Sequence, residues 1–73
     1  MIKLDIYVKE DCGPCKVLKA FILRHRVKLQ RKFDITFHDR SEGIEKGIRQ
    51  FPTAYFDGKQ VTTAKEIIAQ LGG

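Results

Sequence analysis

Hydrophobic and polar positions change their period along the chain, and each change marks a new element. Residues 2–8 alternate strictly, the pattern of a half-buried strand, and their apolar side holds Ile2, Leu4, Ile6 and Val8. From Lys16 the apolar positions recur at helical spacing, and one stripe holds Leu18, Phe21, Ile22, His25 and Leu29. Pro14 suits the first turn of this helix, where no backbone N–H donor is needed. The chain therefore opens with a strand and a long helix.

The rest of the chain predicts three strands and two short helices. Residues 33–38 alternate as a second strand, and residues 53–56 and 59–62 flank Asp57-Gly58, a strong signal for a tight hairpin. Ser41 could cap a short helix over residues 42–47. Thr63 with Glu66 three residues later is a capping-box pattern that opens a last helix. The order β-α-β-α-β-β-α predicts an α/β fold with a four-stranded mixed sheet and three helices.

Length and composition limit the class of protein. With 73 residues the chain has room for one domain, residues 1–73, and 42% hydrophobic residues are ordinary for a globular protein. No apolar run approaches the roughly 20 residues of a membrane-spanning helix, and the N-terminus lacks a signal-peptide pattern. We therefore expect a cytoplasmic monomer with no membrane partner.

The net charge of +5 comes from one segment, because residues 16–32 include no acidic residue. The basic residues of this segment are Lys16, Lys19, Arg24, Arg26, Lys28, Arg31 and Lys32. Such a face speeds encounter with acidic partners, whether protein or nucleic acid, although a solvated helix face is the simpler interpretation. Nucleic acid is not the expected partner, because Phe21, Phe33, Phe37 and Phe56 fall on faces that should be buried and leave little for a base-stacking platform.

Two cysteines, Cys12 and Cys15, lie in Cys-Gly-Pro-Cys between the first strand and the first helix. A disulfide between them closes so short a loop that it would stabilise the fold little. In a reducing compartment such a pair is reactive or metal-binding. A closed zinc site needs four ligands, and the other candidates, His25 and His38, lie in separate elements. A reactive pair, with no metal, is therefore the main hypothesis, and a zinc module is the alternative.

The segment from the first strand through Cys12-Gly13-Pro14-Cys15-Lys16 to the helix resembles the active-site segment of thioredoxins. Residues 47–53, Gly-Ile-Arg-Gln-Phe-Pro-Thr, resemble the thioredoxin segment around a cis-proline. The element order is similar to the minimal thioredoxin fold of glutaredoxins, and the resemblance covers essentially the whole chain. It implies a thiol–disulfide oxidoreductase that reduces protein disulfides, with no bound cofactor and a redox-active Cys12–Cys15 disulfide.

The resemblance also assigns roles to residues. Cys12 begins a helix whose unpaired N–H groups stabilise an anion, so it is the expected nucleophile, and Cys15 is the expected resolving cysteine. Gly13 and Pro14 form the active-site loop, and this pair is similar to that of strongly reducing thioredoxins. Phe51, Pro52 and Thr53 are expected to line the substrate groove, with Pro52 in cis and the Phe51 backbone pairing with an extended substrate.

The sequence departs from both thioredoxins and glutaredoxins near the expected site. Ile6 stands where thioredoxins have a buried acid, and Asp11 replaces their tryptophan before the first cysteine. A carboxylate at Asp11 disfavours a thiolate at Cys12, whereas Lys9 and Lys16 oppose that effect.

Tyr7 and Lys9 match positions where glutaredoxins often have an aromatic and a basic residue. The Gly-Gly-x-x-Asp segment with which glutaredoxins hold glutathione is absent. We therefore expect electrons from a thioredoxin-reductase-type enzyme in preference to glutathione, and donation to ribonucleotide reductase or other cytosolic enzymes. A glutathione-dependent glutaredoxin is the alternative within this class, and a zinc- or nucleic-acid-binding module the alternative outside it.

Overall fold

A computed structural model describes residues 1–73 and contains one mixed sheet with strand order β2-β1-β3-β4. β1 (Ile2–Tyr7) is central, because it pairs in parallel with β2 (Phe33–His38) and antiparallel with β3 (Thr53–Phe56). β4 (Lys59–Thr62) completes the sheet as the hairpin partner of β3. The four predicted strands and their mixed pairing are confirmed. No helix has the length and apolar character needed to cross a membrane.

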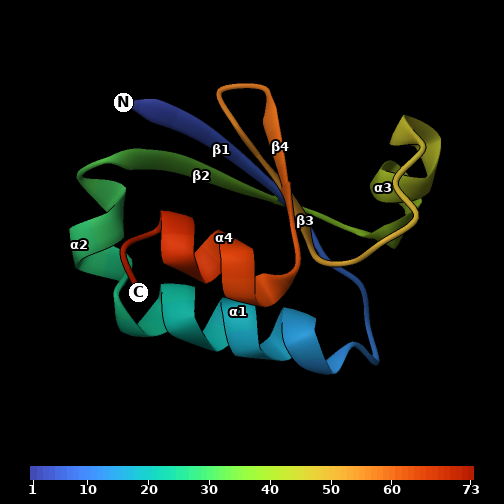
Figure 1. The fold of residues 1–73 in the computed structure, drawn as a ribbon, viewed down its shortest axis with the longest axis horizontal. Helices are drawn as coiled ribbons and strands as arrows, with labels where there is room; N and C mark the ends of the chain where they lie inside the picture. The colour runs from blue at the N-terminus through green and yellow to red at the C-terminus, as the bar shows by residue number, and fades with distance from the viewer.

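One face of the sheet carries the hydrophobic core. α1 (Gly13–Arg24) and α4 (Ala64–Gln70) pack side by side beneath this face (Figure 1). The side chains buried between helices and sheet include Leu4, Ile6, Leu18, Ile22, Ile67 and Leu71. Leu4 and Ile6 point to this face because alternate residues of a strand share a side. The core therefore fixes the position of α1, and with it the start of that helix, against β1.

Local turn and cap signals are confirmed at the C-terminal half of the chain. Asp57 and Gly58 have φ values of 50° and 87°, and positive φ at both positions is what a type I′ hairpin turn requires. The Asp57 carboxylate also accepts the Lys3 N–H at 2.9 Å, which ties the turn to β1. The Thr63 hydroxyl accepts the Glu66 N–H at 3.2 Å and caps α4.

The prediction of three helices is wrong, because the structure has four. His25, with ψ of 22°, ends α1, and a separate α2 (Arg26–Gln30) follows and packs against β2. Leu29 stays buried after the break. The hydrophobic spacing is therefore preserved across His25, and the sequence pattern alone could not reveal the interruption.

The cap expected for the short helix is also wrong. α3 (Arg40–Lys46) is capped by Asp39 and not by Ser41, since the Asp39 carboxylate accepts the Glu42 N–H at 2.9 Å and the Glu42 carboxylate accepts the Asp39 N–H at 3.2 Å. This reciprocal capping box satisfies two N–H groups, where Ser41 would satisfy one. Gly47 ends the helix in the left-handed conformation, with φ of 89°.

Phe37 was expected to be buried, and it is not. Its side chain is 42% exposed, whereas Phe33 at the other end of β2 is buried. β2 is an edge strand, and α2 is only five residues long, so no element covers Phe37 as the core covers the central strand. Leu23 and Val27, which lie off the apolar stripe, point away from the core.

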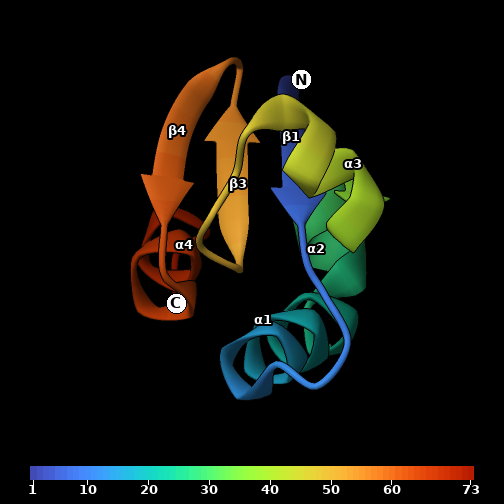
Figure 2. The ribbon, with the colours of Figure 1, turned by 90° about the vertical axis from the view of Figure 1, so that its right-hand side faces the viewer.

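α3 covers the opposite face of the sheet, near the end where α1 begins (Figure 2). His38 at the end of β2 connects the sheet to α3. Its Nε2 lies 2.9 Å from Asp5 Oδ1 on β1, and its Nδ1 lies 2.9 Å from Glu42 Oε2 on α3. The ring also stacks on Tyr7, with 4.4 Å between centroids. The polar side of the sheet is therefore joined to α3 through one imidazole.

The two carboxylates change the titration of this cluster. Hydrogen bonds to Asp5 and then to Glu42 raise the pKa of His38, because an imidazolium can donate to both. The same bond from His38, with the Asp39 N–H, lowers the pKa of Glu42. Burial and the charges of Asp5 and Glu42 raise the pKa of Tyr7, so this phenol stays neutral beside them. An imidazolium at position 38 is therefore the form that the folded protein favours.

Replacing His38 by Asn should cost more stability at about pH 6 than at about pH 9, by up to about 1 kcal/mol, as for a solvent-accessible ion pair. The raised pKa means that the contribution is complete below the unfolded value of about 6.5 and is lost as pH rises through the folded value. Urea unfolding of the native protein and of His38→Asn at the two pH values measures this difference in the free energy of unfolding. His25→Asn is the matched control, because His25 contacts Phe21 and forms no ion pair. Equal losses for His38→Asn at both pH values would contradict the assignment.

Candidate active site

The cysteine pair is positioned by the connection from the central strand to α1. Val8 continues the line of β1, and its N–H donates to the His38 carbonyl at 3.0 Å. The chain then turns at Asp11, whose φ is 55°, and Cys12 takes an extended conformation as the N-cap of α1. Pro14 lies in the first turn of the helix, as predicted. Cys12 is thereby placed at the carboxyl end of β1, the edge where α/β sites usually lie.

The two sulfur atoms are joined as a disulfide and differ in their surroundings. Cys12 Sγ accepts the Cys15 N–H at 3.2 Å, so an N–H group at the start of α1 points at this sulfur. The Cys12 carbonyl accepts the Lys16 N–H at 3.1 Å and begins the helical ladder. Cys12 is 6% exposed and Cys15 only 1%. Cys12 is therefore the outer sulfur and Cys15 the inner one.

The segment before β3 lies against the outer sulfur. The Phe51 carbonyl oxygen is 3.8 Å from Cys12 Sγ, and the Phe51–Pro52 peptide bond is cis. Pro52 and Thr53 are buried, and the Thr53 hydroxyl donates to the Gln50 carbonyl at 2.5 Å. Of the three residues that the sequence placed in a substrate groove, Phe51 thus borders Cys12, and Pro52 and Thr53 belong to the segment that holds Phe51 in this position.

The other four proposed neighbours of the cysteines lie in different surroundings. Lys9 Nζ lies 5.6 Å from the centre of the ring of Phe51, the residue whose carbonyl borders Cys12. Tyr7 lies on the α3 face of the sheet, where it packs on His38 and, like the Phe51 ring, borders Gly43. Asp11 and Lys16 are exposed on either side of the cysteine motif and make no side-chain hydrogen bond or ion pair.

Gly43 packs against the ring of Phe51, a contact that sequence reasoning missed. A Cβ atom at this position would lie 2.7 Å from the Phe51 ring, which shows that the ring occupies the space a side chain would need. Gly43 is buried within α3, where glycine costs about 1 kcal/mol relative to alanine. A glycine inside a predicted helix was the available signal, although the segment that packs on it could not be identified from sequence.

The surface around the disulfide contains neither a metal cluster nor a cavity. No group of three or more His, Cys, Asp or Glu side chains is arranged to hold a metal ion. Both nitrogens of His38 face carboxylates, and His25 lies at the far end of α1. The hollows of the molecule are lined by other residues than Cys12, Cys15 and Phe51. Cys12, which is 6% exposed, therefore borders none of these hollows.

Comparison with known proteins identifies the fold. No family model matches the chain, and no curated protein sequence matches it. Solved structures do match it over 97% of its length. Thioredoxin of Malassezia sympodialis has a TM-score of 0.66 at 20% identity, with 72% of its chain covered. Thioredoxin f2 of Chlamydomonas reinhardtii has a TM-score of 0.66 at 17% identity and 76% coverage. Oxidised thioredoxin of Plasmodium falciparum has a TM-score of 0.63 at 23% identity and 78% coverage. The chain therefore has the thioredoxin fold, with a Cys-x-x-Cys disulfide at the start of its first helix.

Proposed function

We propose that this protein is a thiol–disulfide oxidoreductase that reduces disulfides in other proteins. The observation that carries the proposal is the position of Cys12, whose sulfur accepts an N–H of α1 and lies 3.8 Å from the Phe51 carbonyl oxygen. N–H groups and the partial positive charge at a helix start favour a thiolate, which is the attacking species in disulfide exchange. Lys9, near the ring of Phe51, adds positive charge on the same side.

The reaction is a two-step exchange. The Cys12 thiolate attacks one sulfur of a substrate disulfide, so that a mixed disulfide forms and the other substrate sulfur leaves as a thiolate and takes up a proton. Cys15, one helical turn away, then attacks Cys12, which re-forms the Cys12–Cys15 disulfide and releases the second substrate thiolate. Two electrons pass to the substrate, and the protein ends in the disulfide form of the structure.

The inner position of Cys15 suits the resolving role. At 1% exposure its sulfur is shielded from outside thiols, yet it forms a bond with Cys12 without a change of fold. Ile6, which stands where thioredoxins have an acid, is fully buried in the core. Proton transfer to and from Cys15 is therefore assigned to substrate groups or solvent that reach the site in the mixed disulfide.

Protein substrates are favoured over glutathione by the shape of the site. No cavity opens at Cys12 that would enclose a tripeptide, whereas the Phe51 backbone beside the sulfur suits pairing with an extended chain. We assign the return of electrons to a thioredoxin-reductase-type enzyme, and the cellular setting to a reducing compartment such as the cytoplasm, where ribonucleotide reductase is one candidate acceptor. Glutathione as the electron source is the alternative.

Cys15→Ser should trap substrates on Cys12. Without the resolving thiol the mixed disulfide persists, and mass spectrometry of captured complexes should find Cys12 linked to a substrate cysteine. The Cys12→Ser/Cys15→Ser double variant is the control and should capture nothing. The native protein should catalyse insulin reduction by dithiothreitol, and either single variant should lose at least about a hundredfold of that rate, since each step needs its own sulfur. Insulin turnover by Cys12→Ser at the native rate would end the proposal.

Cys12 of the reduced protein should react with iodoacetamide at a lower pH than a free cysteine does. The start of α1 stabilises the thiolate, so the rate against pH should reach half its maximum earlier than for a cysteine in an unfolded peptide. Mass spectrometry assigns the label to Cys12 or Cys15. A profile that matches the unfolded peptide would show that the helix does not activate this sulfur.

Gly43→Val should impair turnover through Phe51. The added side chain occupies the place of the Phe51 ring and displaces the carbonyl that borders Cys12. Insulin reduction should fall several-fold, while the alkylation rate of Cys12 stays within about twofold because the helix start is intact. Circular dichroism verifies that the variant is folded. Unchanged insulin reduction by a folded Gly43→Val protein would remove Phe51 from the substrate site.

A further inference from the structure

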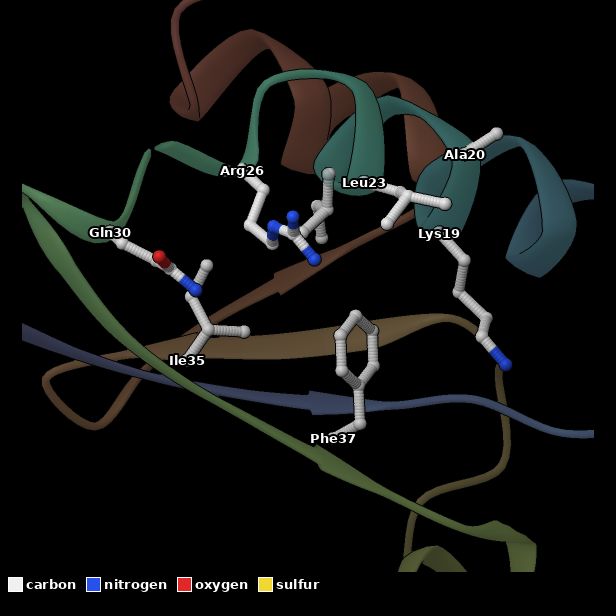
Figure 3. A pocket seen from close by; sticks show the side chains of 8 residues that line it. Lys19, Ala20, Leu23, Arg26, Gln30, Ile35 and Phe37 are labelled. Atoms are coloured by element: carbon white, nitrogen blue, oxygen red, sulfur yellow. The ribbon is translucent and has the colours of Figure 1, made fainter. Parts of the chain in front are cut away.

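A groove runs between the helices and the exposed edge of the sheet, away from the disulfide. It encloses about 380 Å³ and is lined by residues of α1, α2 and β2. Its apolar floor and wall include Phe37, Ile35 and Leu23, and Leu23 is 67% exposed. Figure 3 shows Lys19 and Arg26 reaching from the helices on either side of Phe37. A solvent-exposed apolar surface with cations at its rim is the composition of a binding site.

The free edge of β2 runs along the same groove. β2 is an edge strand. The carbonyls of Lys32, just before β2, and of His38, at its end, accept the N–H groups of Ile2 and Val8 on the β1 side. Since successive residues of a strand alternate in direction, the N–H and C=O groups of Ile35 and Phe37 point outward from the sheet. Both side chains that β2 contributes to the groove thus belong to residues whose backbone offers hydrogen bonds to an added strand.

We propose that this groove binds an extended acidic segment of a partner protein, which adds a strand to β2. Strand addition supplies backbone hydrogen bonds, and side-chain pockets supply the specificity. A partner strand would place every second side chain over the groove. An apolar residue with acidic residues two positions before and after it would meet Leu23 and Phe37 in the centre and Lys19 and Arg26 at the sides.

Charge selects this occupant over two others. Lys19 and Arg26 belong to a segment of seven basic residues without an acidic one, so an acidic chain is attracted and a second copy of this protein is repelled. Nucleic acid would also be attracted, but it offers no backbone groups at strand spacing for Ile35 and Phe37. β4, the other edge of the sheet, borders no cavity. The edge, the apolar floor and the cations coincide only at β2.

The groove lies on the helix that carries the cysteines but does not include them. Lys19 is seven residues beyond Cys12, which is about 10 Å of helix rise. The proposed site therefore stands whether or not the cysteine pair is catalytic, and binding can be measured without any redox assay.

The test uses a fluorescein-labelled synthetic peptide, Ser-Glu-Thr-Leu-Thr-Glu-Ser, and fluorescence anisotropy. We expect saturable binding that weakens as salt rises, and Lys19→Glu/Arg26→Glu should weaken it at least tenfold. Lys28→Glu/Arg31→Glu changes the net charge equally on exposed positions outside the groove and should change binding less than threefold. An equal loss in both double variants would reduce the effect to general charge attraction and overturn the proposal. So would full binding by Leu23→Ser/Phe37→Thr.

Strand addition is tested with two N-methylated forms of the peptide, which block alternate amides. Only one alternating set of amides can face β2, so one form should lose binding and the other keep it. In nuclear magnetic resonance spectra, the amide signals of Ile35 and Phe37 should shift most on titration with the unmodified peptide. Equal behaviour of the two methylated forms, displacement of the peptide by oligo-dT at equal concentration, or dimerisation of the free protein through β2 in analytical ultracentrifugation would each refute the proposal.

Discussion

The start of α1 is the constraint on which the site depends. Cys12 Sγ accepts an N–H of its own helix at 3.2 Å and lies 3.8 Å from the Phe51 carbonyl oxygen. The two contacts come from segments almost forty residues apart, and the sheet brings them together. Tyr7, the last residue of β1, pairs with Thr53, the first residue of β3, so the chain leaving one strand and the chain entering the other meet at one edge. The register of a single strand pair therefore sets the surroundings of the Cys12 sulfur.

The two faces of the sheet are held in different ways. On one face α1 and α4 bury an apolar core, whose strength depends on area removed from water and little on pH. On the other face α3 is attached through His38, whose ring bonds to Asp5 and Glu42. α3 in turn supports Phe51 through Gly43. The part of the fold that supports Phe51 is thus linked to a titrating group, while the part that positions the cysteines is not.

α1 combines chemistry at its first turn with a basic surface at its other end. The apolar stripe that anchors it in the core includes Leu18 and Ile22, and this leaves Lys19 and Leu23 free to face outward beside β2. A helix anchored this firmly can present both surfaces without moving, because close-packed cores resist displacement. The proposed oxidoreductase site and the proposed peptide groove therefore share a scaffold but no side chains.

The sequence by itself determined the elements whose signals are local. Strand alternation, the Asp57-Gly58 turn, the Thr63 cap and Cys-Gly-Pro-Cys before a helix are all patterns within a few residues, and the structure contains each of them. Tertiary structure alone decided the break at His25 and the exposure of Phe37. It also decided the packing of Phe51 against Gly43 and the bonds of His38 to two carboxylates. The hydrophobic period runs unchanged through the break, and the exposure of Phe37 depends on how far a short helix reaches over an edge strand. Periodicity and capping report the energies of neighbours along the chain, whereas contacts between distant segments depend on the register in which the sheet assembles them.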